Sequence, residues 1–551
     1  MLSNVRISVR RRQRPAGEIA APKGRSLSAE PALATSPTRF THRETVIIIA
    51  GLMLGMFLAA LDQTIVATAL PRMAADLQGV SHLSWVVSAY LLTSTAVTPI
   101  YGKLSDLYGR KLMLQIAISL FVLTSLLCGL ADTMVQLIVF RALQGLGGGG
   151  LLAMAHATIA DVISPRERGR YQGYIASVFA AASVVGPVLG GLFVDHLTWR
   201  WVFWINLPIG IGALIASQIT LKRLAAKRLR HKIDYLGAIL IVSAVCCVLL
   251  VTTMGGEEVP WDSLVIKALA AGAAVLFIGC IFQERKASEP ILPPRLFHNP
   301  VFVVANAANL LTSICMLGGI VFMPLFLQLA YSMQADASGL MLIPLTGGTV
   351  AGAISAGQLV ARTGRYKIFP LVGLATSCIG LFMLVTVTPQ TPLPLVCAYL
   401  AINGLGIGLI MPALLVAVQN SVDVRDLGTG TASITFFRSM GGSFGVALFS
   451  AVLIGRLNGL IARMPGGEAL GSSPGTNLLH AGPDAIASVP PALRAAVAGA
   501  IAEAFHDIFL MAAALSFVAF IILLFLKELP LRTSTGAPGD AAKVVAAALA
   551  D

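Results

Sequence analysis

Long apolar runs alternate with short polar segments along most of the chain. A run of about 20 apolar residues is what a helix needs to cross the ~30 Å hydrocarbon core of a bilayer. Backbone groups in lipid must bond internally, so each span is a helix or part of a closed barrel. These runs are too long and too uniformly apolar for barrel strands. The predicted helices are 46–70, 84–101, 112–130, 134–158, 171–194, 201–221, 235–254, 264–283, 301–329, 338–361, 367–387, 393–418, 431–455 and 505–527.

The composition is that of a membrane protein, and it changes how the positive net charge is interpreted. Of 551 residues, 56% are hydrophobic and only 12% are charged, whereas soluble domains carry about 25% charged residues. A net charge of +13 can indicate a nucleic-acid partner, but here the basic residues lie between apolar runs. We therefore expect the lipid bilayer as surroundings and no nucleic-acid partner.

Lys and Arg gather in every second loop, which predicts the orientation. The basic loops are 102–111, 166–170, 222–232, 285–286 and 362–367. Basic loops stay on the cytoplasmic side. The alternation therefore predicts a multi-pass protein of the cell membrane, the bacterial inner or plasma membrane, with both termini cytoplasmic. The long outer segment 456–504 is weak evidence either way, and its Ala-rich end, 491–505, is expected to form a surface helix.

The two halves of the chain share a repeated pattern. Gly102–Lys111 follows the second span and Gly357–Tyr366 follows the tenth, with Gly, Leu, Gly and Arg at matching positions. Three further glycine pairs lie 259 residues apart: Gly145 and Gly404, Gly169 and Gly428, Gly186 and Gly445. Repeated halves around a midplane site are typical of secondary transporters. The predicted organisation is a disordered tail (1–44), a six-helix bundle (45–221), an inserted helix pair with linkers (222–300), a second six-helix bundle (301–530) and a tail (531–551).

No sequence feature indicates ATP use, a cofactor or an enzyme. Gly145–Gly150 lies within an apolar helix, and no Gly-x-x-x-x-Gly-Lys-Ser/Thr sequence is present. We expect energy from an ion gradient or from the solute itself. The cysteines all fall inside apolar runs and are expected to be small core residues rather than disulfides or metal ligands. They are Cys128, Cys246, Cys247, Cys280, Cys315, Cys378 and Cys397.

Ionisable residues inside spans are the main candidates for function, because a charge in hydrocarbon is costly. Asp62 and Arg141 each lie about 7 residues from the outer end of their helix, roughly 10 Å deep at 1.5 Å per residue. Matched depth allows them to pair, either as a proton-loading group or as a static packing contact. Arg438 has no acid inside a neighbouring span, so it is expected to bond carbonyls or to snorkel. His156 is expected to be an interfacial histidine with a satisfied hydrogen bond.

Two glycine-containing segments suggest moving parts. Gly186-Pro187 with Gly190 and Gly191 predicts a kinked helix that another backbone approaches closely, either as a moving seam or as ordinary packing. The segment 102–111 is expected to be a loop with glycine turns. Its charges could latch the inner face or simply be solvated.

Five segments resemble the major facilitator superfamily and its fourteen-helix drug:proton antiporter family. Gly102–Lys111 is similar to the superfamily signature between its second and third helices. Leu61–Pro71 and Arg141–Gly145 are similar to motifs of the fourteen-helix family's first and fourth helices. Gly186–Gly191 is similar to the antiporter motif of its fifth helix. Trp199–Gly210 is also typical of that family.

The resemblance implies a two-bundle transporter that works by alternating access and exchanges protons for drugs, dyes or amphipathic metabolites. It implies proton coupling by Asp62 and Arg141. The implied inner gate comprises Gly102, Asp106, Gly109 and Arg110, and the implied antiporter motif comprises Gly186, Pro187, Gly190 and Gly191.

Three departures and two alternatives accompany this interpretation. Ala182 stands where the family often has glycine, and Ala361 stands where the second repeat would match Asp106. The tenth span has no buried acid, which weighs against dicationic substrates.

One alternative function is a dedicated exporter of a lipid or specific metabolite, with an envelope adaptor protein left open as a partner. The other is a non-transporting sensor or scaffold, against which the intact Asp62 and Arg141 weigh.

Overall fold

The computed structural model describes residues 42–79, 82–222, 234–255, 259–331, 333–465 and 491–531, all within one unit that begins at Phe40. These residues form helices and no strand. Fourteen of the helices are long and apolar enough to cross a bilayer, which confirms the predicted number. Most of the predicted tails, most of the basic loop 222–232 and part of the segment 456–504 lie outside the described residues, whereas residues 42–44 of the predicted disordered tail belong to a helix.

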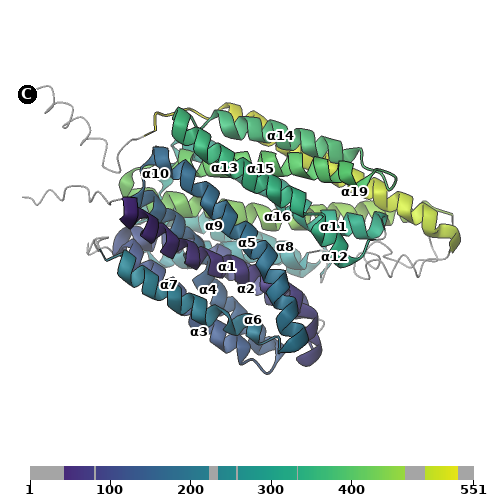
Figure 1. Ribbon diagram of the computed structural model, residues 1–551, viewed down its shortest axis with the longest axis horizontal. Helices are drawn as coiled ribbons and strands as arrows, with labels where there is room; N and C mark the ends of the chain where they lie inside the picture. Colours follow the sequence, from purple (N-terminus) through teal and green to yellow (C-terminus); the bar gives the residue numbers. More distant parts are fainter. Residues whose placement is uncertain are drawn as a thin grey trace, which may run out of the picture. The chain divides into compact units, whose positions relative to one another are not determined.

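The first six spans pack together as the purple-to-blue helices of Figure 1. Short α6 and α7 together make the sixth span. The bounds are α1 (His42–Asp76), α2 (Leu83–Tyr108), α3 (Arg110–Gly129), α4 (Met134–Val162), α5 (Pro165–His196), α6 (Trp201–Trp204) and α7 (Asn206–Thr220).

The last six spans form the second group, green to yellow in Figure 1. Short α12 leads into α13, and a 3-10 turn, η2, leads into α16. The bounds are α11 (Pro300–Ala330), α12 (Ala335–Leu340), α13 (Ile343–Thr363), α14 (Ile368–Val385), α15 (Leu393–Ser421), η2 (Val424–Asp426), α16 (Leu427–Ala462) and α19 (Pro491–Leu524).

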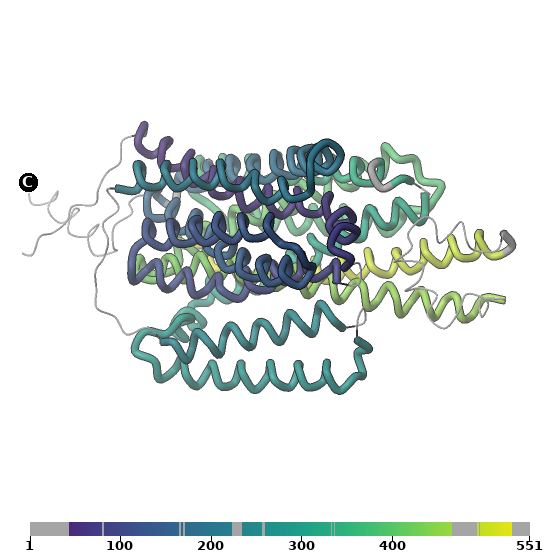
Figure 2. Tube along the Cα trace, turned by 90° about the horizontal axis from the view of Figure 1, so that it is seen from below, coloured from purple at the N-terminus to yellow at the C-terminus, as the bar shows by residue number. Residues whose placement is uncertain are grey.

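An inserted pair, α8 (Tyr235–Met254) and α9 (Leu264–Lys286), lies to one side of the other helices and is drawn in teal in Figure 2. The two helices pack against each other, and α8 also packs against α2 and α16. Ile241 and Val245 of α8 share an apolar cluster with Ala96 of α2 and Phe436 of α16. The pair therefore contacts both six-helix groups where they meet, and short α10 (Pro294–Phe297) connects it to α11.

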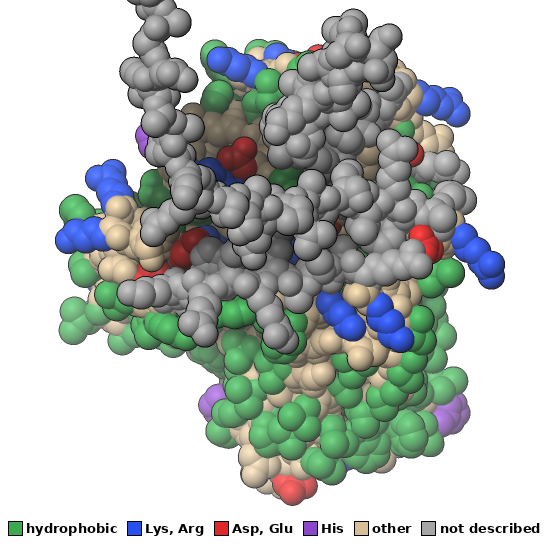
Figure 3. Space-filling view, turned by 90° about the vertical axis from the view of Figure 1, so that its left-hand side faces the viewer, with side chains coloured by type: hydrophobic (Ala, Val, Ile, Leu, Met, Phe, Trp, Pro, Cys, Tyr) green, Lys and Arg blue, Asp and Glu red, His purple; other side chains and the backbone are tan. Residues whose placement is uncertain are grey.

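The two groups join through α2 against α16 and through α5 against α13. We call the end of the bundle where α2 passes into α3 the Gly109 end. The start of α1 lies on the same side in Figure 1. Figure 3 looks onto this end, where Lys and Arg side chains gather around the rim and hydrophobic side chains cover the flank below them. Such an apolar flank suits contact with lipid tails.

Two predicted boundaries are wrong. Residues 102–108 are not a loop but the last turns of α2. Only Gly109, with φ of 94°, interrupts the helical conformation between α2 and α3. The charged residues there are buried against partner groups, so they do not need a solvated loop. Residues 491–505 are helical, but they continue into the last span as one helix, α19.

Candidate functional site

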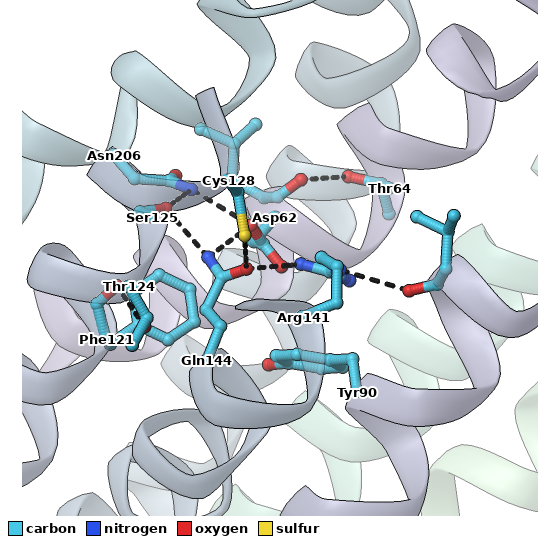
Figure 4. A network of polar contacts seen from close by, with 12 residues as sticks. Asp62, Thr64, Tyr90, Phe121, Thr124, Ser125, Cys128, Arg141, Gln144 and Asn206 are labelled. Atoms are coloured by element: carbon cyan, nitrogen blue, oxygen red, sulfur yellow. Dashed lines mark hydrogen bonds and ion pairs between the residues drawn. The ribbon is translucent and has the colours of Figure 1, made fainter. Parts of the chain in front are cut away.

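Asp62 of α1 and Arg141 of α4 form an ion pair inside the first six-helix group (Figure 4). Arg141 Nη1 lies 2.7 Å from Asp62 Oδ2, and the side chains are 1% and 0% exposed. Equal depth in the sequence allowed this pairing, and the structure shows that α1 and α4 are in contact. Because removal of two charges from water is costly, such a pair persists only when further hydrogen bonds satisfy both groups.

Three polar side chains supply those hydrogen bonds. Asp62 Oδ1 accepts from Gln144 Nε2 at 3.0 Å and from Asn206 Nδ2 at 2.9 Å. The same two amides donate to Ser125 Oγ, at 2.7 and 2.9 Å. Arg141 Nη1 also donates to Gln144 Oε1 at 2.7 Å. The Asp62 carboxylate is therefore bound by groups from α4 and α7, which are both linked to α3.

Arg141 is held independently of Asp62. Its Nε donates to the Val86 carbonyl of α2 at 3.1 Å, and its guanidinium carbon lies 4.3 Å from the centroid of the Tyr90 ring. A cation over an aromatic face is attracted by the ring quadrupole. The arginine would thus stay in place if Asp62 lost its charge.

Three residues of this network, Gln144, Asn206 and Ser125, were not predicted from the sequence. Gln144 is three residues after Arg141, a spacing that places both on one face of a helix. Asn206 is a polar residue that begins an apolar helix, and it is fully buried. Buried polar side chains are normally hydrogen-bonded, so both could have been suspected. Ser125 carried no distinguishing signal.

Gly186 and Gly190 let α5 lie directly against α1. A Cβ at Gly186 would overlap Thr64 Oγ1 and lie 2.7 Å from Thr64 Cβ, and one at Gly190 would overlap Thr68 Oγ1. Thr64 Oγ1 also donates to the Ala182 carbonyl at 2.9 Å. Gly191, by contrast, has nothing within 4 Å of an added Cβ. The predicted close approach thus involves two of the three glycines, and the contact of Gly186 with Thr64 lies within one turn of Asp62.

Substitution of Gly186 by alanine is expected to destabilise the protein by about 1–3 kcal/mol, because an added methyl group has to displace the Thr64 side chain. Thermal unfolding of the purified protein measures this effect. Gly191→Ala is the matched control on the same helix and should leave the unfolding temperature unchanged or slightly raised. Equal effects of the two substitutions would contradict the described packing of α1 on α5.

Asp106 joins the two six-helix groups at the Gly109 end. Its carboxylate accepts from the backbone N–H groups of Gly428 (2.9 Å) and Thr429 (2.8 Å) and from Thr429 Oγ1 (3.0 Å). These N–H groups belong to the first turn of α16, where no intrahelical partner is available. The N-cap residue Asp426 makes no capping bond itself. Asp106 of α2 thus caps a helix of the other group, which also suits the helix dipole.

Arg110 fixes the Asp106 carboxylate. Arg110 Nη2 lies 2.7 Å from Asp106 Oδ1, and its Nε lies 2.7 Å from Asp161 Oδ2 at the end of α4. A Cβ at Gly428 would overlap Arg110 Nη1, and one at Gly102 would lie 2.9 Å from the Gly428 carbonyl. The two glycines therefore face each other and allow the contact. Asp161 and Gly428 were not assigned to this contact from the sequence.

The connection between α9 and α11 makes two further ion pairs at the same end. Lys103 Nζ lies 2.6 Å from Glu289 Oε2, and Arg295 Nη2 lies 2.8 Å from Asp426 Oδ1. The first pair contacts α2, and the second contacts the start of α16. The inserted pair is thereby tied to both sides of the Asp106 contact.

Comparison with known proteins decides the family. Residues 52–446 match the description "Major Facilitator Superfamily". The chain belongs to the major facilitator superfamily. It is therefore a transporter rather than an enzyme, and a multi-pass membrane protein.

Similar major facilitator proteins include several whose names refer to drugs. "Multidrug transporter protein MdtP" of Bacillus subtilis is 40% identical over 417 residues, 75% of this chain and 76% of that protein. "Multidrug resistance protein 3" of the same organism is 33% identical over 505 residues, 90% of this chain and 98% of that protein. An uncharacterized MFS-type transporter of Mycobacterium tuberculosis is 39% identical, over 88% of this chain and 70% of that protein.

Solved structures support the major facilitator fold. The human organic anion transporter MFSD10 aligns with a TM-score of 0.58 at 13% identity, over 87% of this chain and 99% of that one. The proton:xylose symporter XylE aligns with a TM-score of 0.58 at 13% identity, over 92% of this chain and all of that one. At this identity the likeness concerns the fold alone.

The repeat within this major facilitator chain is visible at its turns. Gly109 and Gly364 are the glycines with positive φ among the described residues, at 94° and 70°, and each ends the second helix of its half. The acid is present only in the first half, because Ala361 replaces the counterpart of Asp106. Of these two matching positions, only the one in the first half therefore supplies an acid to the contact between the halves.

The remaining candidates lie on helices that meet between the halves. His156 of α4 is buried, and its Nδ1 lies 2.8 Å from the Leu152 carbonyl. Arg438 of α16 lies within a membrane span and is partly exposed. All seven cysteines are free. Among the described residues, no group of three or more His, Cys, Asp or Glu side chains could hold a metal ion.

Proposed function

We propose that the chain exports apolar and amphipathic small molecules across the cell membrane, in exchange for protons and by alternating access. The names of its relatives MdtP and Multidrug resistance protein 3 support a drug-like substrate. The observation that carries the proton part is Asp62, a fully buried carboxylate within a membrane-spanning helix. An ionisable group at such a place usually marks an ion pathway.

The Asp62 network would adopt different arrangements when the carboxylate is ionised and when it is protonated. The ionised carboxylate needs Arg141, Gln144 and Asn206 as partners, whereas the neutral acid is no longer attracted by the arginine. Arg141 keeps its bonds to the Val86 carbonyl and the Tyr90 ring, so it does not follow the change. Protonation would therefore loosen α1 from α4 while the rest of the site stays in place. A proton can shift such an equilibrium only by its different affinity for the two states.

Alternating access also needs a contact that closes one side and then breaks. The contact of Asp106 with the start of α16 closes the Gly109 end, together with the ion pairs of Lys103 and Arg295. We assign this end to the cytoplasm, with both termini on that side, because its loops carry the excess of Lys and Arg. On this assignment, the described state has its inner side closed.

Inside-out vesicles test the proposal. An inside-acid gradient should drive uptake of at least one dye from a panel of apolar and amphipathic dyes, and nigericin, which collapses the pH gradient, should stop it. Vesicles without the protein are the control. If uptake continues after collapse of the gradient, the proton part is wrong. If no dye moves, the drug part is wrong, and a lipid or a specific metabolite becomes the substrate to test.

Asn206→Ala is expected to reduce gradient-driven uptake several-fold, because it removes one of the two amides that bind Asp62 Oδ1. Loss of one partner of a buried charged group costs about 1–3 kcal/mol. Gln218→Ala is the matched control, because it removes an exposed amide from the same helix. Uptake and thermal unfolding would both be measured. Equal uptake by the two variants would exclude Asn206 from the coupling site.

A further inference from the structure

Arg438 is a charged residue inside a membrane span that the proposed proton pathway does not use. It lies eleven residues after Leu427, where α16 begins. At 1.5 Å per residue this is roughly 16 Å from the Gly109 end, near the middle of a ~30 Å hydrocarbon core. At that depth the side chain cannot be explained by snorkelling to the membrane surface, which holds near helix ends.

The Arg438 guanidinium makes no hydrogen bond or ion pair with any described residue. Neither sequence-based expectation, a bond to carbonyls or a place near the inner end, fits this position. A charge inside the hydrocarbon core without a partner is costly. Arg141, the fully buried arginine of α4, has Asp62, Gln144 and a carbonyl as partners. The contrast indicates that the partner of Arg438 is a molecule that binds and leaves.

Arg438 also lies where a transported molecule would pass. It is within electrostatic reach of His156 on α4, which belongs to the other six-helix group. Helices α4 and α16 are in contact across the boundary between the halves. Arg438 is partly exposed, so part of its surface is accessible to a bound molecule. Binding sites of secondary transporters lie near the midplane between the repeated halves.

We propose that Arg438 binds the carboxylate of an amphipathic substrate at mid-membrane. The inference rests on the proposed export function and narrows its substrates to those that include organic acids. A planar guanidinium binds a carboxylate through two parallel hydrogen bonds, which a lysine ammonium does not reproduce. The apolar body of the substrate would lie against the surrounding helices.

An acid and its ester test the proposal, because they differ only at the carboxyl group. Rhodamine 110 carries the free carboxylate, and rhodamine 123 is its methyl ester. Fluorescence polarisation with the purified full-length protein would give the affinity of wild type, Arg438→Gln and Arg438→Lys for each dye. Arg365→Gln is the matched control, because it removes an exposed charge from a loop of the same half.

We expect wild type to bind the acid more tightly than the ester. Arg438→Gln should weaken binding of the acid by about tenfold or more and leave the ester unchanged, with Arg438→Lys in between. The unfolding temperature of Arg438→Gln should not fall, since the variant removes an unpaired charge from the middle of a membrane span. The inference is wrong if wild type binds the acid no more tightly than the ester, or if Arg438→Gln weakens both dyes equally.

Gradient-driven uptake in inside-out vesicles separates this inference from the proposed function. Uptake of rhodamine 123 by both wild type and Arg438→Gln would support proton-coupled export whatever the acid does. Failure of wild type to move either dye would count against the export function as well as against the acid site.

Discussion

Asp62→Asn is expected to abolish gradient-driven dye uptake in inside-out vesicles, to the level of vesicles without the protein. Asparagine keeps the size of the side chain but cannot bind and release a proton. It also leaves Arg141 without its countercharge, and removal of one partner of a buried pair costs about 3–5 kcal/mol. Gln144, the Val86 carbonyl and Tyr90 still contact the arginine, so the fold should persist.

The control for this substitution is Asp132→Asn, which neutralises an acid whose side chain is 85% exposed and only loosely paired. It should transport as wild type does. Asp62→Asn should lose the uptake that a pH gradient drives, but it should still carry dye passively down a concentration gradient of the dye. Wild-type uptake by Asp62→Asn under a pH gradient would remove Asp62 from proton coupling and leave the fold as described.

Asp106→Ala is expected to open the Gly109 end and to reduce gradient-driven uptake by about tenfold or more. The substitution removes three hydrogen bonds to the first turn of α16 and one of the two carboxylate partners of Arg110. Hydrogen bonds to a charged group contribute about 1.5–3 kcal/mol each. Their loss favours the state in which the two halves separate at this end.

The distance between spin labels attached at positions Leu112 and Arg365 measures that opening. The labels would be introduced on cysteines in a variant that lacks the native cysteines. Both positions are exposed, and they lie on opposite halves. Asp106→Ala should lengthen the distance distribution between them, whereas Asp423→Asn, an exposed acid at the same end, should not. An unchanged distribution in Asp106→Ala would show that this contact does not hold the halves together.

The sequence predicted the span number, the type of fold and the pairing partners Asp62 and Arg141. It did so because membrane spans are long apolar runs and because depth along a helix follows from residue count alone. It could not predict the end of α2, since Asp106 and Arg110 resemble a solvated loop until their partners are known. Those partners, Asp161 and Gly428, come from distant helices and have no local signal.

The Asp62 network shows the same limit. Gln144 could be suspected from its spacing to Arg141, but the meeting of Asn206 with Asp62 depends on how α7 packs against α1. Arg438 shows the opposite case. The sequence correctly found no acid for it, yet only the structure shows that it lies at mid-depth beside the other half. Uniformly apolar helices give no periodicity that would show which faces meet.

Proton release on substrate binding tests the central claim most directly. A dye that the vesicle assay identifies as transported is added to the purified protein in weakly buffered solution, and the pH change is recorded. Wild type should release protons as the dye binds, and Asp62→Asn should bind dye without releasing any. Proton release by Asp62→Asn equal to that of wild type, or none by either protein, would contradict proton exchange at Asp62.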